Sequence, residues 1–371
     1  MRAPSAAAGA LLWSSVVREV HVLGVGATSF ARAGRSGDEL AREAITAALA
    51  DAGVRLRDVP AFTLARGNGQ TAGGDSHLFG VGEGRPLPPV CVSGAAALHL
   101  GWLAVSSGVH DLVLCVGREL AAAGPEPPPR DRIEALAAAA GRYLEASGAT
   151  EEQLARVVAK NRQHGAANPR ALLTTAVAPG DVLDGELVEW PLRDAMVAPA
   201  SEGAAAVVLS SSERGRRGGA RAPRILASTL VREGGVDPLA SAAGRAARTA
   251  YEAAELGPES IDCAEIDHPT AAGELAAYEA LQFAPDGQGA ELVDSGFTAL
   301  GGVLPVNTSG GALAQGEATG AAGIAQLCEL AWQLRGEAGR RQVPGARVGL
   351  ALASGHESDR GIVSLTLLKT G

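Results

Sequence analysis

The chain has 371 residues, of which 46% are hydrophobic and 20% are charged, and its formal net charge is −9 at pH 7. These values are typical of a globular protein, and the length allows about two to three domain units or one large fold with two similar halves. The negative charge argues against nucleic acid as a main partner, because phosphate binding needs a basic face.

The cysteines and the N-terminus suggest where the protein resides. The cysteines at positions 91, 115, 263 and 328 form no CxxC pair or metal-ligand spacing, which argues against a zinc site and favours a reducing compartment. The N-terminal stretch lacks the features of a secretory signal, and no stretch approaches the ~18–20 apolar residues of a membrane span. We therefore expect a cytoplasmic protein with no membrane span.

The first part of the chain alternates between strand and helix patterns. Apolar runs predict strands at 20–26, 59–67 and 109–119. A helical pattern over 38–53 ends at Gly53, and 88–108 has the pattern of a strand end, a tight turn and a buried helix. Such alternation predicts a layered α/β fold with a largely parallel sheet.

Residues 118 to about 190 interrupt this alternation. A proline-rich stretch, "AAAGPEPPPRDR", predicts a loop and precedes two predicted helices, over 133–148 and 150–166. Thr150 and Gln153 form a capping-box pattern at the start of the second helix. A strand pattern returns over 202–211. We interpret the interruption as an insertion that lies over the core.

The second part repeats the order of the first. The segment "PPVCVSGAAALHLGW…HDLVLCVG" corresponds to "LPVNTSGGALA…ARVGLALASG", each being a strand end, a small-residue turn, a helix and a buried strand. The later helix is expected after Gly323. This correspondence predicts two duplicated halves. Further strands are predicted at 224–232, 261–267 and 361–369, and a helix is predicted at 239–257.

Several blocks in this order resemble the thiolase superfamily, and in particular the sterol-carrier-protein type of thiolase. They are "CVSGAAAL", "GRYLEASGATEEQLARVVAKNRQHGAANPRA", "AEIDHPTAAGELAAYEAL", "VNTSGGALAQGEATGAAG" and "WQLRGEAGRRQVPGARVGLALASG". The resemblance spans almost the whole chain. It implies a layered αβαβα fold with two pseudo-duplicated halves, a homodimer, and a coenzyme A thioester as substrate with no bound cofactor or metal.

The resemblance also implies a division of the chain. An N-terminal half would comprise residues 1–117 and 197–214, a loop domain would be inserted at 118–196, and a C-terminal half would comprise residues 215–371.

Cys91 is the candidate nucleophile. It stands at a strand-to-helix turn, where the unpaired N–H groups of a helix N-terminus favour a thiolate. In the family that this chain resembles, the cysteine at this position takes the acyl group from coenzyme A. The alternative is a buried structural cysteine, which is the interpretation we give to Cys115, Cys263 and Cys328.

Three further residues complete the candidate catalytic set. Glu317 occupies the position of a family histidine, and Asp267, followed by His268, occupies the position of a second one. The late cysteine of ordinary thiolases has no match, and His356 lies in the segment that takes its place. Glu317 could be the remnant of a lost site, Asp267 a surface strand end and His356 the cap of a turn. His164 is expected to have a packing or hydrogen-bonding role in the loop domain.

These substitutions leave three functions open. Oxyanion stabilisation in Claisen chemistry needs hydrogen-bond donors, which ionised carboxylates do not provide. A protonated Glu317 could still donate, whereas an ionised one could remove the hydroxyl proton of a β-hydroxyacyl thioester in a retro-aldol cleavage. Some thiolase-like relatives catalyse that cleavage with an OB-fold and zinc-ribbon partner. The expected function is therefore a thiolase-like acyl-CoA enzyme of the acyltransferase class, with an aldolase or a catalytically degenerate scaffold as alternatives.

Overall fold

The computed structural model describes residues 18–32, 34–67, 90–91, 93–120, 129–211, 222–232, 238–354 and 362–370. Its main feature is a nine-stranded mixed sheet with the strand order β3-β2-β4-β7-β1-β8-β11-β10-β9. Among the described residues, no helix is both long enough and apolar enough to cross a membrane.

One end of this sheet is built by the N-terminal part of the chain, in the order β3-β2-β4-β7-β1. Its helices are α2, which covers the outer face, and α3, which packs on the opposite face. The elements are β1 (Val20–Ala27), α2 (Gly37–Ala52), β2 (Ala61–Arg66), β3 (Val90–Cys91), α3 (Gly94–Ser106), β4 (Leu112–Glu119) and β7 (Gly203–Ser211).

The C-terminal part supplies the strand order β8-β11-β10-β9, which a bridge between Ala264 and Val306 extends by one position. This order matches that of the first part strand for strand, so the structure has the predicted duplicated αβαβα fold. The elements are β8 (Arg224–Arg232), α8 (Pro238–Ala254), β9 (Cys263–Asp267), α9 (Ala271–Ala280), α10 (Gly289–Asp294), α11 (Gly311–Gln315), α12 (Thr319–Arg335), β10 (Val348–Ser354) and β11 (Ile362–Lys369).

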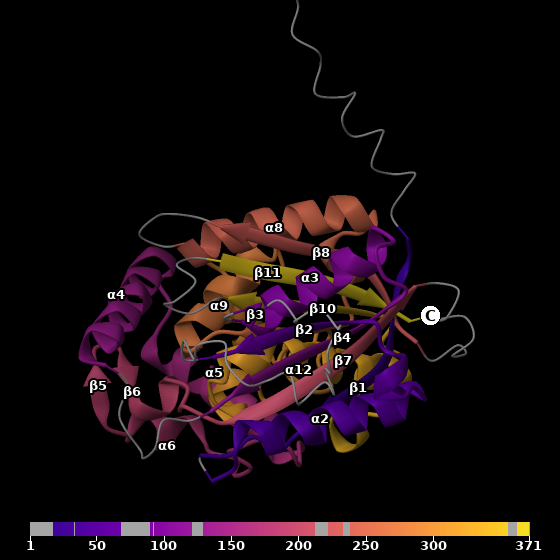
Figure 1. Ribbon diagram of the computed structural model, residues 1–371. Helices are drawn as coiled ribbons and strands as arrows, with labels where there is room; N and C mark the ends of the chain where they lie inside the picture. Colours follow the sequence, from indigo (N-terminus) through magenta and orange to yellow (C-terminus); the bar gives the residue numbers. More distant parts are fainter. Residues whose placement is uncertain are drawn as a thin grey trace, which may run out of the picture.

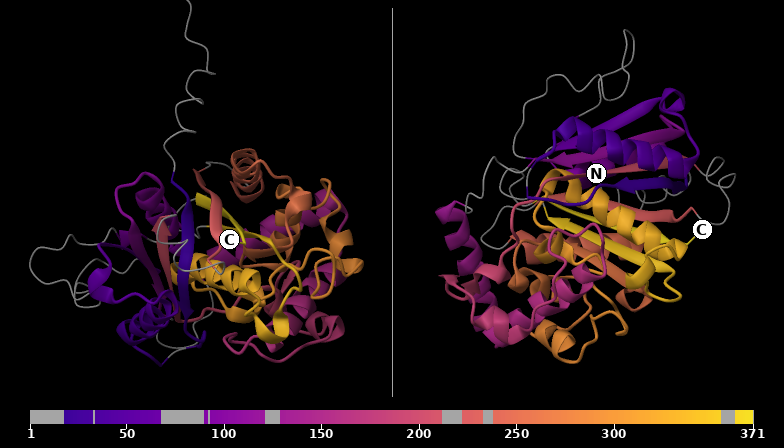
Figure 2. Two further views of the ribbon diagram at one scale, coloured as in Figure 1. Left: turned by 90° about the vertical axis from the view of Figure 1, so that its right-hand side faces the viewer. Right: turned by 90° about the horizontal axis from the view of Figure 1, so that it is seen from below.

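The two halves share a central helical layer. Helix α12 packs against α3 and contacts strands of both halves, including β4, β7, β9 and β10. Helices α2 and α8 lie on the outside, and Figure 1 shows them on opposite sides of the molecule. In the right-hand view of Figure 2, the indigo N-terminal elements lie beside the yellow C-terminal ones.

The sheet differs in one respect from the expectation of largely parallel strands. The pairs β2–β3, β2–β4 and β9–β10 are parallel, but the pairs β4–β7, β1–β7, β1–β8, β8–β11 and β10–β11 are antiparallel. Parallel neighbours need a crossover connection, whereas β11 follows β10 after a short segment and pairs with it as a hairpin partner. An apolar run does not reveal strand direction, so the sequence pattern missed this.

The inserted segment forms the helical end of the molecule, on the left in Figure 1. It contains α4 (Arg130–Ser147), α5 (Glu151–Ala166), α6 (Pro179–Leu183), β5 (Leu187–Glu189) and β6 (Leu192–Arg193). The predicted capping box is present, since Thr150 accepts from the Gln153 N–H and the Gln153 side chain accepts from the Thr150 N–H. The exact boundaries of the insertion and of the two halves stay a prediction.

Short 3₁₀ helices complete the described secondary structure. They are η1 (Leu56–Asp58), η3 (Asp194–Met196), η4 (Pro258–Ser260) and η5 (Gly339–Arg341).

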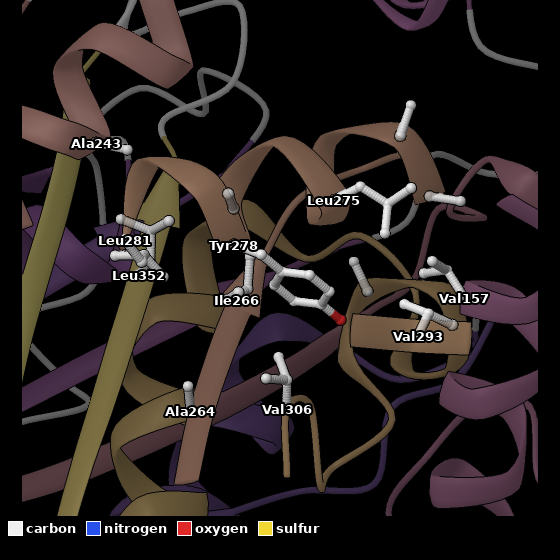
Figure 3. Close-up of a cluster of buried hydrophobic side chains, with 14 of the residues drawn as sticks. Val157, Ala243, Ala264, Ile266, Leu275, Tyr278, Leu281, Val293, Val306 and Leu352 are labelled. Carbon is white, nitrogen blue, oxygen red and sulfur yellow. The ribbon is translucent and has the colours of Figure 1, made fainter. Parts of the chain in front are cut away.

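Tyr278 is one of the largest fully buried side chains and marks the core of the C-terminal half. Figure 3 shows its ring among Ile266, Leu275 and Val306. This core continues into the inserted segment through residues such as Val157. The insertion therefore shares its apolar core with the C-terminal half.

Helix α12 begins at Thr319, five residues before Ile324, where the sequence predicted its start. The glycines of its first turns are part of the helix and allow other backbones to approach closely. A Cβ on Gly320 would lie 2.1 Å from the Arg118 carbonyl oxygen, and one on Gly323 would lie 2.5 Å from the Ala95 backbone nitrogen. Two glycines within five residues suggested a turn, but here they serve helix packing.

Replacing Gly320 by alanine is expected to destabilise the protein by about 3 kcal/mol, because the added methyl meets backbone atoms of β4 and of Gly67, just after β2, which cannot move aside cheaply. Gly180→Ala is the matched control, since a Cβ there meets nothing within 4 Å. Urea unfolding of both variants measures the difference. Equal midpoints for the two variants would show that the helix can shift at no cost.

Candidate active site

The first turns of α3 and α12 meet the carboxyl end of β9 around one small cavity. Its lining includes side chains from both halves: Ser93, Ala95, Asp267, Thr319, Gly323 and Ala353. Two helix N-termini thus face the same hollow, and their unpaired N–H groups favour negative charge there. Two similar halves placed back to back produce this arrangement.

Cys91 ends β3, two residues before the N-cap of α3. It pairs with Ala65 of β2 and is half-buried. The cap itself is Ser93, whose hydroxyl accepts the Ala96 N–H at 3.3 Å. All four cysteines are thiols, and the other three have fully buried side chains in the core, as predicted. Cys91 is only two residues from Ser93, which lines the shared cavity.

Glu317 lies just before α12 and makes an ion pair with the inserted segment. Its Oε1 is 2.5 Å from Nη2 of Arg132, in the first turn of α4, and both side chains are largely buried. Its backbone is fixed as well, since its N–H donates to the Pro199 carbonyl at 2.7 Å and its carbonyl accepts from the Ser201 N–H. The guanidinium stabilises the ionised form of this carboxyl group.

Asp267 is the last residue of β9 and is buried, with 7% of its surface exposed. It lines the cavity with Ser93 and Thr319 and sits beside Ala353 of β10. His268 turns toward α9, where its Nδ1 accepts the Thr270 N–H at 3.2 Å. Asp267 stands where the resemblance places a histidine, and His268 follows it. The cavity wall therefore contains a carboxyl group and not an imidazole.

Glu119 is a functional candidate that the sequence analysis did not single out. It ends β4, is only 4% exposed, and its Oε2 accepts the Gly320 N–H at 2.9 Å in the first turn of α12. Burial raises its pKa to about 7, and the negative charge of Glu317 also contributes. The sequence signal was weak: a polar residue at the carboxyl end of a buried strand.

The sequence also pointed to His356 and His164. His356 lies outside the described residues. His164 is buried on α5, with Nδ1 at 2.9 Å from the Asn307 carbonyl oxygen and Nε2 accepting the Leu300 N–H. Burial lowers its pKa to about 3, so it is neutral, and its hydrogen-bonding role is confirmed.

The described residues contain no group of three or more His, Cys, Asp or Glu side chains that could hold a metal ion. The cavity instead combines two helix N-termini with the carboxyl group of Asp267. Two further carboxyl groups lie at the start of α12 in different environments. Glu317 has a cationic partner, whereas the buried carboxyl of Glu119 has a raised pKa. The Glu119 carboxyl, with its pKa raised to about 7, can take up and release a proton near neutral pH.

Comparison with known proteins agrees with this architecture. Residues 232–365 match the family model "Thiolase C-terminal domain-like". The chain is 34% identical to an acetyl-CoA acetyltransferase of Methanothermobacter thermautotrophicus, over 90% of this chain and 95% of the relative. It is 32% identical to sterol carrier protein 2 of Bos taurus, over 96% of this chain and 73% of the relative.

The fold also matches a solved structure, described as an Ltp2-ChsH2(DUF35) aldolase. The TM-score is 0.83 at 24% identity, and the match covers 96% of this chain and 98% of the other. The identity and coverage of the sequence relatives confirm the predicted resemblance, and the chain belongs to the thiolase superfamily.

Proposed function

We propose that this protein acts on an acyl-CoA thioester and cleaves a carbon–carbon bond next to it, by retro-aldol cleavage of a β-hydroxyacyl-CoA. The observation that carries the proposal is the ion pair between Glu317 and Arg132, just before the N-terminus of α12. Relatives of this chain include an acetyl-CoA acetyltransferase and an aldolase, which supports a thioester substrate and a reaction at the adjacent carbons.

The charge of Glu317 favours cleavage over Claisen condensation. Claisen chemistry develops negative charge on the thioester oxygen and needs donors directed at it. An ionised carboxylate would repel that charge, but it is suited to removing a hydroxyl proton. Asp267, in the wall of the cavity between the two halves, adds a second carboxyl where the resemblance places a histidine.

The test is to incubate the purified protein with β-hydroxyacyl-CoA thioesters and to identify the products. Cleavage gives a carbonyl compound and a shortened acyl-CoA without consuming free coenzyme A. A requirement for free coenzyme A, with thiolysis of a β-ketoacyl-CoA instead, would contradict the retro-aldol proposal. No turnover of either substrate would leave only the scaffold alternative.

Acyl transfer through Cys91 is the second candidate. The position of this thiol two residues before the N-cap of α3 supports it, because the helix terminus favours a thiolate. The same incubation distinguishes the two: an acyl group on Cys91, detected by mass, indicates transfer. Cleavage that survives Cys91→Ala indicates the aldolase reaction.

We also propose that the protein assembles with other chains. Helix α3 exposes Leu100 and Leu103 next to the edge strand β3, which supports the predicted homodimer. The aldolase with the same fold carries a DUF35 component in its name, which supports the predicted OB-fold and zinc-ribbon partner. A monomer mass in sedimentation would exclude the dimer.

The cysteine thiols agree with the proposed cytoplasmic location.

A further inference from the structure

The carboxyl group of Glu119 is unusual because only one of its oxygens is satisfied. Oε2 accepts the Gly320 N–H, while Oε1 is buried and has no hydrogen-bond partner among the described residues. A buried acceptor without a donor is costly, and each such group calls for an explanation. A proton on Oε1 would turn the orphaned acceptor into a donor.

The surroundings of Glu119 act on this proton in opposite directions. Burial and the negative charge of Glu317 raise the pKa of Glu119, whereas the N–H groups of Gly320 and Leu120 lower it, and burial has the largest effect. The residue after β2, Gly67, brings its backbone so close that an added Cβ would overlap Oε2, and α12 provides the Gly320 N–H. The charged group beside it is Glu317, and the Leu120 N–H is the remaining donor. Arg118 precedes Glu119 and points to the opposite face of β4, where it pairs with Asp38 at 2.7 Å.

Glu119 and Glu317 are therefore carboxyl groups in contrasting environments. Glu317 is matched by a guanidinium at 2.5 Å, whereas Glu119 has no ion pair within the described part of the chain and feels the charge of Glu317. Two nearby acids whose surroundings favour opposite protonation states are the arrangement that divides acid and base roles in an active site.

We infer that Glu119 is the proton donor of the site and Glu317 its base, an assignment that rests on the proposed retro-aldol function. The Glu317 carboxylate takes the proton of the β-hydroxyl group, and the C–C bond breaks as the new carbonyl forms. The electron pair of that bond moves to the α-carbon as an enolate. Glu119 gives its Oε1 proton to this carbon, and the proton on Glu317 then restores Glu119, so the cycle needs no other reactant.

Deuterium exchange tests the donor separately from cleavage. A shortened acyl-CoA such as acetyl-CoA is incubated with the protein in D2O, and incorporation at the α-carbon is followed by mass. By microscopic reversibility the group that protonates this carbon also removes its proton. We expect Glu119→Gln to slow exchange by at least about 10²-fold, and Glu317→Gln to keep exchange while losing cleavage. Glu279→Gln, at a half-buried carboxylate held by Tyr143, is the control.

The pH dependence of the unmodified protein gives a second measurement that does not depend on folding of a variant. Exchange needs ionised Glu119 and is expected to rise as pH passes about 7, whereas kcat/KM for cleavage needs its protonated form and is expected to fall there. A purely structural Glu119 would not produce opposite dependences on pH.

The outcomes separate the inference from the function on which it rests. Exchange that depends on Glu119, without cleavage of any β-hydroxyacyl-CoA, would reject the retro-aldol function and keep the donor. Exchange at the normal rate in Glu119→Gln, exchange lost in Glu317→Gln instead, or no exchange by the unmodified protein would each overturn the assignment of Glu119.

Discussion

Glu317→Gln is expected to lower kcat/KM for C–C cleavage by about 10²- to 10⁴-fold, the usual contribution of a general base. Glutamine keeps the size of the side chain and an oxygen that can accept from Arg132, but it cannot take a proton. The loss should therefore appear in turnover at every pH at which the protein is folded. Steady-state kinetics with a β-hydroxyacyl-CoA measures it.

The matched control is Asp51→Asn, because Asp51 pairs with Arg335 at 2.6 Å at the opposite end of α12. It removes a similar charge near a largely buried arginine, away from the cavity, and should leave kcat/KM unchanged. Thermal unfolding of both variants separates stability from chemistry. If Glu317→Gln unfolds earlier yet turns over normally, the ion pair only fastens the inserted segment to α12, and the base is another residue.

Lys160→Met is expected to lower the free energy of unfolding by about 3–5 kcal/mol, because it leaves the buried charge of Glu274 uncompensated. Lys160 Nζ lies 2.8 Å from Glu274 Oε1, and both side chains are almost fully buried. Glu274 also accepts hydrogen bonds from Asn161, Tyr278 and Asn307. This cluster ties α5 of the insertion to the C-terminal half, next to the apolar core of Figure 3.

The cost of Lys160→Met should depend on pH. Burial raises the pKa of Glu274, but Lys160 and the hydrogen bonds outweigh it, so the pKa lies below the ordinary 4.5. The unmodified protein therefore gains stability from this carboxylate above pH ~4.5 and loses it as pH falls. Without Lys160 the burial effect prevails, the folded state holds the proton, and the deficit of the variant shrinks in acid.

Urea unfolding at several pH values measures both effects. Arg156→Met is the control on the same helix, since Arg156 forms an exposed i,i+4 pair with Glu152 and should cost no more than about 0.5 kcal/mol. Equal losses for the two variants would mean that the cluster around Glu274 contributes no more than a surface ion pair.

Much of the fold followed from patterns within short windows. Helix α2 ends at Gly53, whose left-handed φ of 61° matches the predicted stop, and Thr150 caps α5 as the capping box indicated. The duplicated order of elements could be read from the similarity of the segments around Cys91 and Ser309. These features depend on neighbours in sequence, so a sequence pattern can carry them.

The direction of β7 and β11 could not be predicted in the same way. Their residues are buried along the whole strand or nearly so, and a continuous apolar run does not distinguish parallel from antiparallel pairing. The start of α12 was missed for a related reason. Gly320 and Gly323 are in a helix because the backbones of Arg118 and Ala95 approach them, and those contacts are more than 200 residues away in the chain.

The candidate site shows the same division. The sequence by itself determined the two halves, the thiol before α3 and the carboxyl groups at positions 267 and 317, because each stands at a recognisable strand end or glycine-rich turn. Only the tertiary structure decided the electrostatic states. Arg132 reaches Glu317 from a different segment, and Glu119 is enclosed by Gly67 and the first turn of α12. The protonation state of a carboxyl group depends on the groups around it in space, however distant they are in the chain.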